Sequence, residues 1–360
     1  MKGDEVNGFS LTYPFHSIDM STIKHARITW VDYAKGIGIS LVVFGHTLRG
    51  IQNSGIIADS SAFRSVDSWI YSFHMPLFYL LSGLFAERRV ERGAGEFFRE
   101  KLSTLAYPYL IWSTLQTLVQ FSVGRHTNHQ TSLHDLARIL IDPIMQFWFL
   151  YALFLISLIY YFLRRCGLGP LAALAIFALF WSTQGWVSLG TWLPLNATRT
   201  NGLYYALGCV MGRHGWIERF ERASMTPMLL TALLGYGVVT VGVAQPLPPN
   251  LPLILILALC GISASIALAV LLTRTRDTEF IRVLGVYSLE IYVAHTIASA
   301  GIRIALQKVL KVQDATTHLV IGTVGGLLLP AVLGLLCRRY HAEFLFRFPQ
   351  GGTKARERRG

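Results

Sequence analysis

Apolar runs of membrane-spanning length follow one another along most of this chain. A transmembrane helix needs about 20 consecutive, mainly apolar residues, and runs near that length extend from residue 30 to residue 337. The gaps between the runs are too short for a soluble domain. We therefore predict an all-α, polytopic membrane protein with about ten transmembrane helices, at residues 30–49, 66–86, 103–122, 145–163, 170–187, 200–212, 227–244, 252–273, 283–305 and 318–337.

The composition excludes several other classes of protein. Only 14% of the 360 residues are charged and 52% are hydrophobic, whereas soluble domains carry about 25% charged residues. So few charges could not cover a soluble fold of this size, and so apolar a chain is not disordered. The four cysteines lie in or beside apolar runs and show no metal-ligand spacing. We therefore expect neither a disulfide framework nor a metal site.

The basic residues predict the orientation of the helices. The chain has 32 Lys and Arg residues against 20 Asp and Glu residues, a net charge of +12. When the N-terminus is placed in the cytoplasm, most of the basic residues fall in cytoplasmic segments, as the positive-inside rule requires. We therefore predict cytoplasmic N- and C-termini. The lipid bilayer, not a nucleic acid, is the expected partner of the basic segments, and the sequence does not define an oligomeric state.

These observations divide the chain into three segments. Residues 1–27 are polar and lack the apolar stretch of a signal peptide, so we interpret them as a cytoplasmic extension. Residues 28–340 form the predicted membrane domain. Residues 341–360 form a basic cytoplasmic tail.

The first predicted span carries ionisable residues that a lipid-facing helix would not tolerate. On a helix, His46 falls about 20° from Lys35 and about 40° from Asp32, so the three residues share one face, and Lys35 and His46 lie about 16 Å apart along it. This face is expected to line the bundle interior or a wet cavity, because charges are costly in lipid. The structural alternative is an ion pair of Asp32 with Lys35 and a helix-end role for His46. Gly36 and Ser40 would let another helix pack closely.

Two later spans place more histidines inside the membrane. In the second span, Pro76 follows His74 closely and predicts a kink in the helix. The ninth span contains Glu290 and His295. Three histidines on separate spans are thus expected at similar depths, in the middle or outer part of the membrane. The structural alternatives are a role for His74 at the kinked backbone and an ion pair between Glu290 and Lys35.

Together these motifs resemble membrane-bound acyltransferase family 3, the integral membrane O-acyltransferases of bacterial glycans. The family's Arg/Lys-x10-His signature is similar to Lys35 and His46, within DYAKGIGISLVVFGH at residues 32–46. The resemblance is to the fucose-acetylase-like branch of the family, and it covers residues 28–340. The other matching segments are FHMPLFYLLSG (73–83), FFREKLSTLAYPYLIW (97–112), FWFL (147–150) and SLEIYVAH (288–295).

The resemblance implies a reaction and a location. Family members move an acyl group, usually acetyl, from cytoplasmic acyl-CoA to a sugar hydroxyl. The expected function is therefore O-acylation of a cell-surface or secreted glycan by a multi-pass protein of the bacterial inner membrane. Acyl-CoA is then a co-substrate, a glycan or lipid-linked saccharide is the acceptor, and no bound cofactor is expected.

The resemblance also assigns roles to residues. His46 is expected to take the proton of the acceptor hydroxyl, while Asp32 and Lys35 orient the polar face or Lys35 meets an anionic part of CoA. His74 and His295 complete the expected catalytic set. Residues 88–101 form a basic loop, and for most of its basic residues the alternative to CoA binding is a solvent-exposed cytoplasmic loop. The expected donor-binding residues are Arg88, Arg89, Arg99, Lys101 and Ser82.

Two other functions are compatible with the sequence. The polar face could line the path of a secondary transporter that exports a lipid-linked sugar or another small molecule. Transporters often repeat a broken helix in both halves of the chain, however, and Pro76 has no obvious counterpart. A non-catalytic subunit of a polysaccharide synthesis complex would give no reason for the embedded Lys and His residues. The sequence leaves open the acceptor, the choice between acetyl and succinyl, and the membrane side of transfer.

Overall fold

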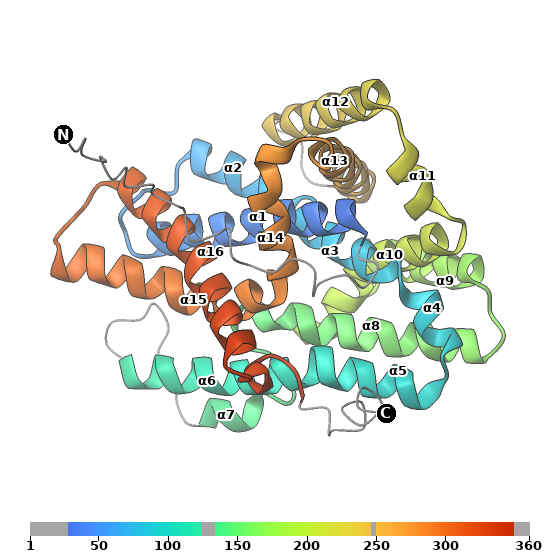
Figure 1. The fold of residues 1–360 in the computed structure, drawn as a ribbon, viewed down its shortest axis with the longest axis horizontal. Coiled ribbons are helices and arrows are strands. Elements are labelled where there is room, and N and C mark those ends of the chain that lie inside the picture. Colours follow the sequence, from blue (N-terminus) through green and yellow to red (C-terminus); the bar gives the residue numbers. More distant parts are fainter. Residues whose placement is uncertain (1–27, 124–133, 246–249, 349–360) are drawn as a thin grey trace, which may run out of the picture.

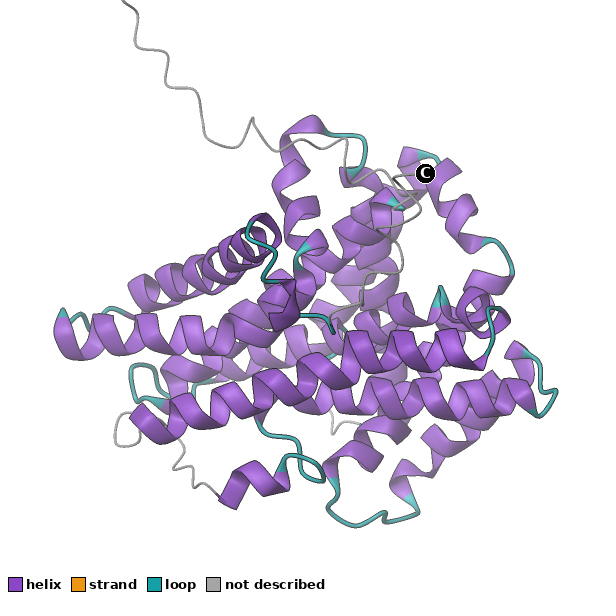
Figure 2. Ribbon diagram, turned by 60° about the horizontal axis from the view of Figure 1, so that its bottom comes forward, coloured by secondary structure: helices purple, strands orange, loops and turns teal. Residues whose placement is uncertain are grey.

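The computed structural model describes residues 28–123, 134–245 and 250–348. Every regular element in these ranges is a helix (Figure 2), so the all-α class is confirmed for the described part of the chain. The predicted N-terminal extension, residues 1–27, and residues 349–360 of the predicted tail lie outside these ranges.

The helices follow one another with short connections. Leu102–Ala106 is a π-helical turn that joins α5 to α6, and Ala305–Val309 is another that extends α15. Short 3-10 turns cover Met145–Phe147, Thr183–Gly185, Arg276–Thr278 and Glu343–Leu345. The α-helices are α1 (Thr29–Asn53), α2 (Ser61–Tyr71), α3 (His74–Gly83), α4 (Ala86–Glu91), α5 (Ala94–Lys101), α6 (Tyr107–Val123), α7 (His134–Arg138), α8 (Trp148–Arg165), α9 (Pro170–Ser182), α10 (Leu193–Arg213), α11 (Trp216–Arg222), α12 (Met225–Ala244), α13 (Leu251–Leu272), α14 (Glu279–Val286), α15 (Ser288–Ile304) and α16 (Ala315–Arg339).

Five helices of the described chain are long and apolar enough to cross a membrane. Each coincides with one of the predicted spans, and the apolar helix Pro170–Gly185 is shorter. By length and composition, therefore, the described chain has five membrane-spanning helices and not the ten predicted, because the other predicted spans form shorter or more polar helices. The five helices are Met145–Arg165, Met225–Ala244, Leu251–Leu272, Ser288–Val309 and Ala315–Arg339.

Two predicted spans are broken in the structure. The second span consists of α2 and α3, with a break at Ser72 and Phe73, and the ninth consists of α14 and α15, with a break at Tyr287. The expected break beside His74 is therefore present, but it precedes His74 instead of following it, and Pro76 does not kink a helix. Pro76 lies in the first turn of α3, where the backbone N–H that proline lacks has no helical partner to lose. The sixth span, in contrast, is longer than predicted and forms α10.

Helix α1 lies at the centre of the bundle (Figure 1). It contacts α3 and α13 to α16, and no residue from 30 to 52 is exposed. Its side chains Ala34, Ile39 and Val43 belong to the apolar core and are completely covered. The polar residues of α1 therefore face protein, as expected from the cost of exposing charge to lipid.

Two glycines let α14 cross α1 in direct backbone contact. A Cβ atom on Gly36 would collide with the carbonyl oxygen of Ile281, and a Cβ atom on Gly285 would collide with that of Asp32. The expected close packing at Gly36 is thus observed, and its partner is α14. The crossing fixes the N-terminal half of α1, including Asp32, against the short helix that precedes α15.

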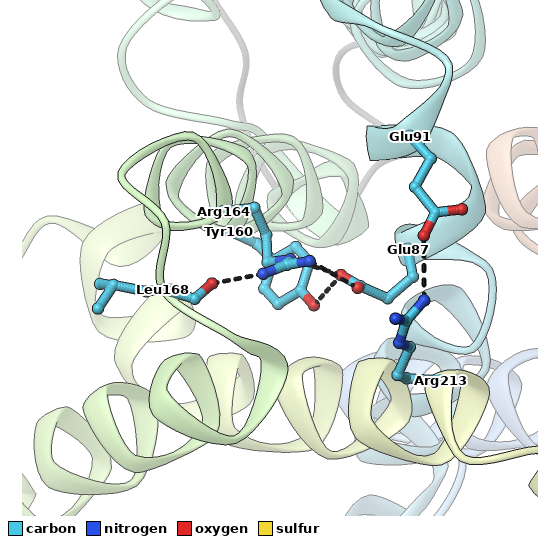
Figure 3. A network of polar contacts seen from close by, with 6 residues as sticks. All are labelled: Glu87, Glu91, Tyr160, Arg164, Leu168 and Arg213. Atoms are coloured by element: carbon cyan, nitrogen blue, oxygen red, sulfur yellow. Dashed lines mark hydrogen bonds and ion pairs between the residues drawn. The ribbon is translucent and has the colours of Figure 1, made fainter.

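A buried ion pair joins α4 to α8 (Figure 3). The Glu87 carboxylate accepts hydrogen bonds from Arg164 Nε and Nη2, at 2.9 and 3.0 Å, and from the Tyr160 hydroxyl at 2.5 Å. The Glu87 side chain is only 6% exposed. One turn further along α4, Glu91 pairs with Arg213 at 3.2 Å, but both of these side chains are more than half exposed. The two pairs therefore differ mainly in burial.

We expect Glu87→Ala to lower the free energy of unfolding by about 3 kcal/mol, because it leaves the largely buried Arg164 without its carboxylate. The matched change Glu91→Ala should lower it by less than about 1 kcal/mol, since exposed ion pairs contribute little. Thermal unfolding of both variants in the same detergent measures the difference. Equal losses would contradict the assignment of Glu87 as the structural anchor of α4.

Candidate active site

A cavity of about 320 Å³ lies between α1, α6 and α15. This volume is at the lower end of the range for small-molecule sites, about 300–1,000 Å³. The wall combines apolar groups with polar and charged side chains. Its polar lining residues are His46, Thr47, Arg49 and Asn53 from α1, Gln116 and Gln120 from α6, and Thr296, Ser299 and Arg303 from α15.

His46 is the predicted catalytic residue that lines this cavity. Its ring packs edge-on against the ring of His295, with 5.1 Å between the ring centroids, and lies 6.4 Å from the ring of Tyr71. The hydrogen bonds of the described residues include none to His46. The ring nitrogens of His46 are therefore available to a molecule in the cavity.

His295 is completely buried beside His46. Its Nδ1 lies 2.8 Å from the carbonyl oxygen of Tyr292 and 3.1 Å from that of Ile291. A carbonyl oxygen only accepts, so Nδ1 carries the proton of the neutral ring and Nε2 is left as an acceptor. Within the described chain, Nε2 is buried and has no hydrogen-bond partner. The adjacent His46 ring could donate an N–H hydrogen bond to this Nε2 atom.

His74 joins the same cluster through Tyr71. The two rings pack edge-on with 4.6 Å between centroids, and the Arg49 guanidinium lies 3.3 Å above the centre of the Tyr71 ring. Two hydrogen bonds to the Asp67 carboxylate, at 2.6 and 2.8 Å, hold Arg49 there. His74 Nδ1 donates to the Ile70 carbonyl oxygen at 2.7 Å. His74 thus satisfies the backbone at the break between α2 and α3, which was the structural alternative for this residue.

The structure separates Asp32 and Lys35 from this cluster. Asp32 is buried near the beginning of α1, Lys35 is half-buried on the next turn, and neither lines the cavity. The helix rises about 16 Å between Lys35 and His46. The Glu290 carboxylate, which was the alternative partner for Lys35, accepts a hydrogen bond from Arg338 at 2.8 Å. The two ends of the predicted polar face therefore lie in different parts of the protein, with His46 at the cavity and Asp32 and Lys35 outside it.

Two of the predicted donor-binding arginines are paired with carboxylates. Arg89 lies 2.8 Å from Glu100, and Arg88 lies 3.5 Å from Glu218. Both arginines lie on α4, Glu100 lies on α5 and Glu218 on α11, and none of the four residues lines the cavity. An anion bound by Arg88 or Arg89 would therefore compete with a carboxylate that is already in place.

The other predicted donor-binding residues differ in exposure. Arg99 is exposed on α5, and the Ser82 hydroxyl donates to the Phe78 carbonyl oxygen of its own helix at 2.8 Å. Lys101 is only 4% exposed, with its ammonium 5.6 Å from the centre of the Phe97 ring. Burial lowers the pKa of Lys101 to about 7. An anion bound beside Lys101 would favour its charged form.

Gln116 and Thr296 line the cavity and contact the buried Gln146 beside it, and none of the three is among the predicted site residues. Gln116, Gln146 and Thr296 form a hydrogen-bonded triad, with donor–acceptor distances of 2.9 to 3.0 Å. Uncharged residues of this kind give no clear signal in a sequence. Arg303 lines the cavity as well and is 9% exposed. The sequence does single out Arg303, because an arginine inside a predicted membrane span is by default a candidate functional residue.

A bundle of apolar helices with a histidine cluster at an internal cavity defines a membrane protein with the groups needed for acid–base chemistry. The chain belongs to the acyltransferase 3 family. It matches the family model, described as an acyltransferase domain, over residues 28–335. The resemblance inferred from the motifs of α1, α3 and α15 is thus confirmed.

Two curated proteins are similar to parts of the chain. Nodulation protein NolL of Mesorhizobium japonicum is 36% identical over 132 residues, which cover 34% of this chain and 32% of that protein. Nodulation protein NolL of Sinorhizobium fredii is 31% identical over 151 residues, 40% of this chain and 39% of that protein. The matched region therefore spans well under half the length of either relative. No solved structure matches the chain significantly.

Proposed function

We propose that this protein is a membrane O-acyltransferase that transfers an acyl group, preferably acetyl, from acyl-CoA to a sugar hydroxyl of a glycan or lipid-linked saccharide. The observation that carries the proposal is the contact of His46 and His295 at the cavity, in a chain that belongs to an acyltransferase family. Acyl transfer to a hydroxyl needs a base, and these rings supply one.

The two histidines have distinct roles in the proposed reaction. A sugar hydroxyl is a weak nucleophile and must lose its proton as it attacks the thioester carbonyl. His46 takes this proton on the nitrogen that faces the cavity and donates the N–H of its other nitrogen to Nε2 of His295. The new C–O ester bond forms, the C–S bond of acyl-CoA breaks, and His46 returns the proton to the departing thiolate. The products are the acylated sugar and free CoA.

The donor would approach from the end of the bundle that carries α4 and α5. Arg99 is exposed there, and the buried Lys101 lies near the point where the chain continues towards α6. The nucleotide phosphates of CoA would remain beside these residues while its thioester arm extends along α6 towards His46. Lys35 belongs to the half of α1 on the same side, so it would meet the donor and not the acceptor.

The proposed orientation has cytoplasmic termini and a location in the bacterial inner membrane. It is supported by the excess of 32 basic over 20 acidic residues and by their distribution between the apolar segments. In this orientation α1 runs outward, so α4 and α5 face the compartment that contains CoA. The additional predicted spans would then complete the multi-pass topology around the five long apolar helices.

Reconstitution of the purified protein into proteoliposomes tests the proposal. With acetyl-CoA labelled in its acetyl group and envelope saccharides from the source cells, we expect label in an alkali-labile ester and an equal amount of free CoA thiol. Liposomes without protein provide the control. Movement of saccharide across the bilayer without ester formation would contradict the proposal and support the transporter alternative.

A further inference from the structure

Arg303 is a buried cation that lines the cavity and has no hydrogen-bond or ion-pair partner among the residues that the structure describes. Its side chain is 9% exposed and lines the same cavity as His46. Among the described residues, no hydrogen bond or ion pair connects it to another group. The other arginines near the bundle interior differ in this respect. Arg49, Arg164 and Arg338 each pair with a carboxylate, and the equally buried Arg199 donates to the Val187 carbonyl oxygen and to Asn196 Oδ1.

An unpaired guanidinium in such a place requires an explanation. Burying a charge is unfavourable unless it is paired, and the penalty is larger within a membrane. Arg303 lies on α15, in a helix long and apolar enough to cross one. The planar guanidinium presents N–H donors in a fixed fork that matches the oxygens of a carboxylate or phosphate. A bound oxyanion would therefore remove the penalty.

The surroundings of Arg303 favour an anion over other ligands. No Asp or Glu is among the residues of the described chain that line the cavity. Arg49 also lines it, although its charge is balanced by Asp67 at 2.6 Å. Ser299 and Thr296 place hydroxyl groups on the same helix. The cavity thus combines one unbalanced positive charge with neutral hydrogen-bonding groups.

We propose that Arg303 binds a carboxylate or phosphate of the acyl acceptor, and that the acceptor is therefore an acidic or phosphate-bearing saccharide. This inference rests on the proposed function, because it names the substrate class of the same cavity. His46 and Arg303 line one cavity of about 320 Å³, so one sugar unit could present a hydroxyl to the first and an anionic group to the second. A volume at the low end of ligand pockets is better suited to a sugar unit than to the whole of CoA.

A binding measurement without turnover tests the inference. The protein is placed in phosphatidylcholine nanodiscs, and the dissociation constants of glucose, glucuronate and glucose 1-phosphate are compared. We expect at least one anionic probe to bind about tenfold more tightly than glucose, as for a charge-assisted bidentate contact. Arg303→Gln should abolish this preference. Arg303→Lys should retain part of it, because it keeps the charge but loses the fork.

Two controls make the result specific to Arg303. Lys308→Gln removes the same charge from an exposed position near the end of the same membrane-spanning helix, and it should leave the preference intact. His46→Gln should also leave it intact, because the anionic group does not contact His46. Equal affinity of the wild-type protein for glucose and both anions would overturn the inference, as would loss of the preference in Lys308→Gln.

A phospholipid headgroup offers the same phosphate chemistry, and nanodiscs of phosphatidylglycerol distinguish this source. If a headgroup occupied Arg303, phosphatidylglycerol would raise the unfolding temperature of the wild-type protein but not of Arg303→Gln, and the soluble anions would not bind. That result would overturn the inference. Anion binding through Arg303 without any acyl transfer would overturn only the proposed function. Acyl transfer to neutral glycans, unaffected by Arg303→Gln, would overturn only this inference.

Discussion

Replacing His46 with glutamine is expected to slow acyl transfer by about 10²–10⁴-fold, the contribution typical of a positioned general base. Glutamine keeps a hydrogen-bonding group beside His295 and in the cavity, but it cannot take a proton from the acceptor hydroxyl. The loss should appear in the initial rate of ester formation in proteoliposomes at saturating acyl-CoA. Thermal unfolding of the variant should stay close to that of the wild-type protein.

The matched control is His214→Gln, the same substitution at an exposed histidine after α10, and it should retain full activity. A His46→Gln protein that folds and transfers acyl groups at the wild-type rate would contradict the assignment of the base. His295→Gln should reduce the rate as well, because it removes the buried Nε2 acceptor beside His46. Its loss should be smaller, since His46 itself remains.

Gly285→Ala is expected to destabilise the protein by about 3 kcal/mol, the upper end of the range for overpacked sites. The added Cβ would collide with the backbone carbonyl oxygen of Asp32 and with the backbone of Gly36. Backbone atoms cannot rotate away as a side chain does, so α14 would have to move off α1. The unfolding temperature in detergent, measured together with the amount of folded protein, reports the effect.

Gly237→Ala provides the control for this change. A Cβ atom on Gly237, within α12, would meet no heavy atom within 4 Å. This substitution should leave stability unchanged or raise it slightly, because alanine favours a helix over glycine by about 1 kcal/mol. Equal effects of the two substitutions would show that α1 and α14 do not depend on close backbone contact.

The candidate site was predictable only in part. His46 and His295 stood out because ionisable residues inside apolar spans are rare, and the structure places their rings in contact. Lys35 stood out for the same reason and shares a helix face with His46, yet it does not line the cavity. Helical periodicity reports direction around an axis, whereas the position of a cavity along that axis depends on which other helices pack there.

Arg303 shows a different limit of sequence reasoning. Its position inside a predicted span was visible, but nothing in the sequence separated it from an arginine paired with a carboxylate. Arg164 and Arg338 find Glu87 and Glu290 across long sequence separations. Whether a charge is paired is settled by contacts between distant segments, so only the folded bundle distinguishes Arg303 from these residues.

The sequence by itself determined the helical class, the burial of the polar face of α1 and the close packing at Gly36, because these follow from hydropathy, helical geometry and residue size within one segment. The tertiary structure decided that α2 is separate from α3 and α14 from α15, and that Pro76 lies in the first turn of a helix. It also decided which ionisable residues share the cavity. These features depend on packing between segments far apart in the chain, where the free energy of each helix is set by its neighbours more than by its own composition.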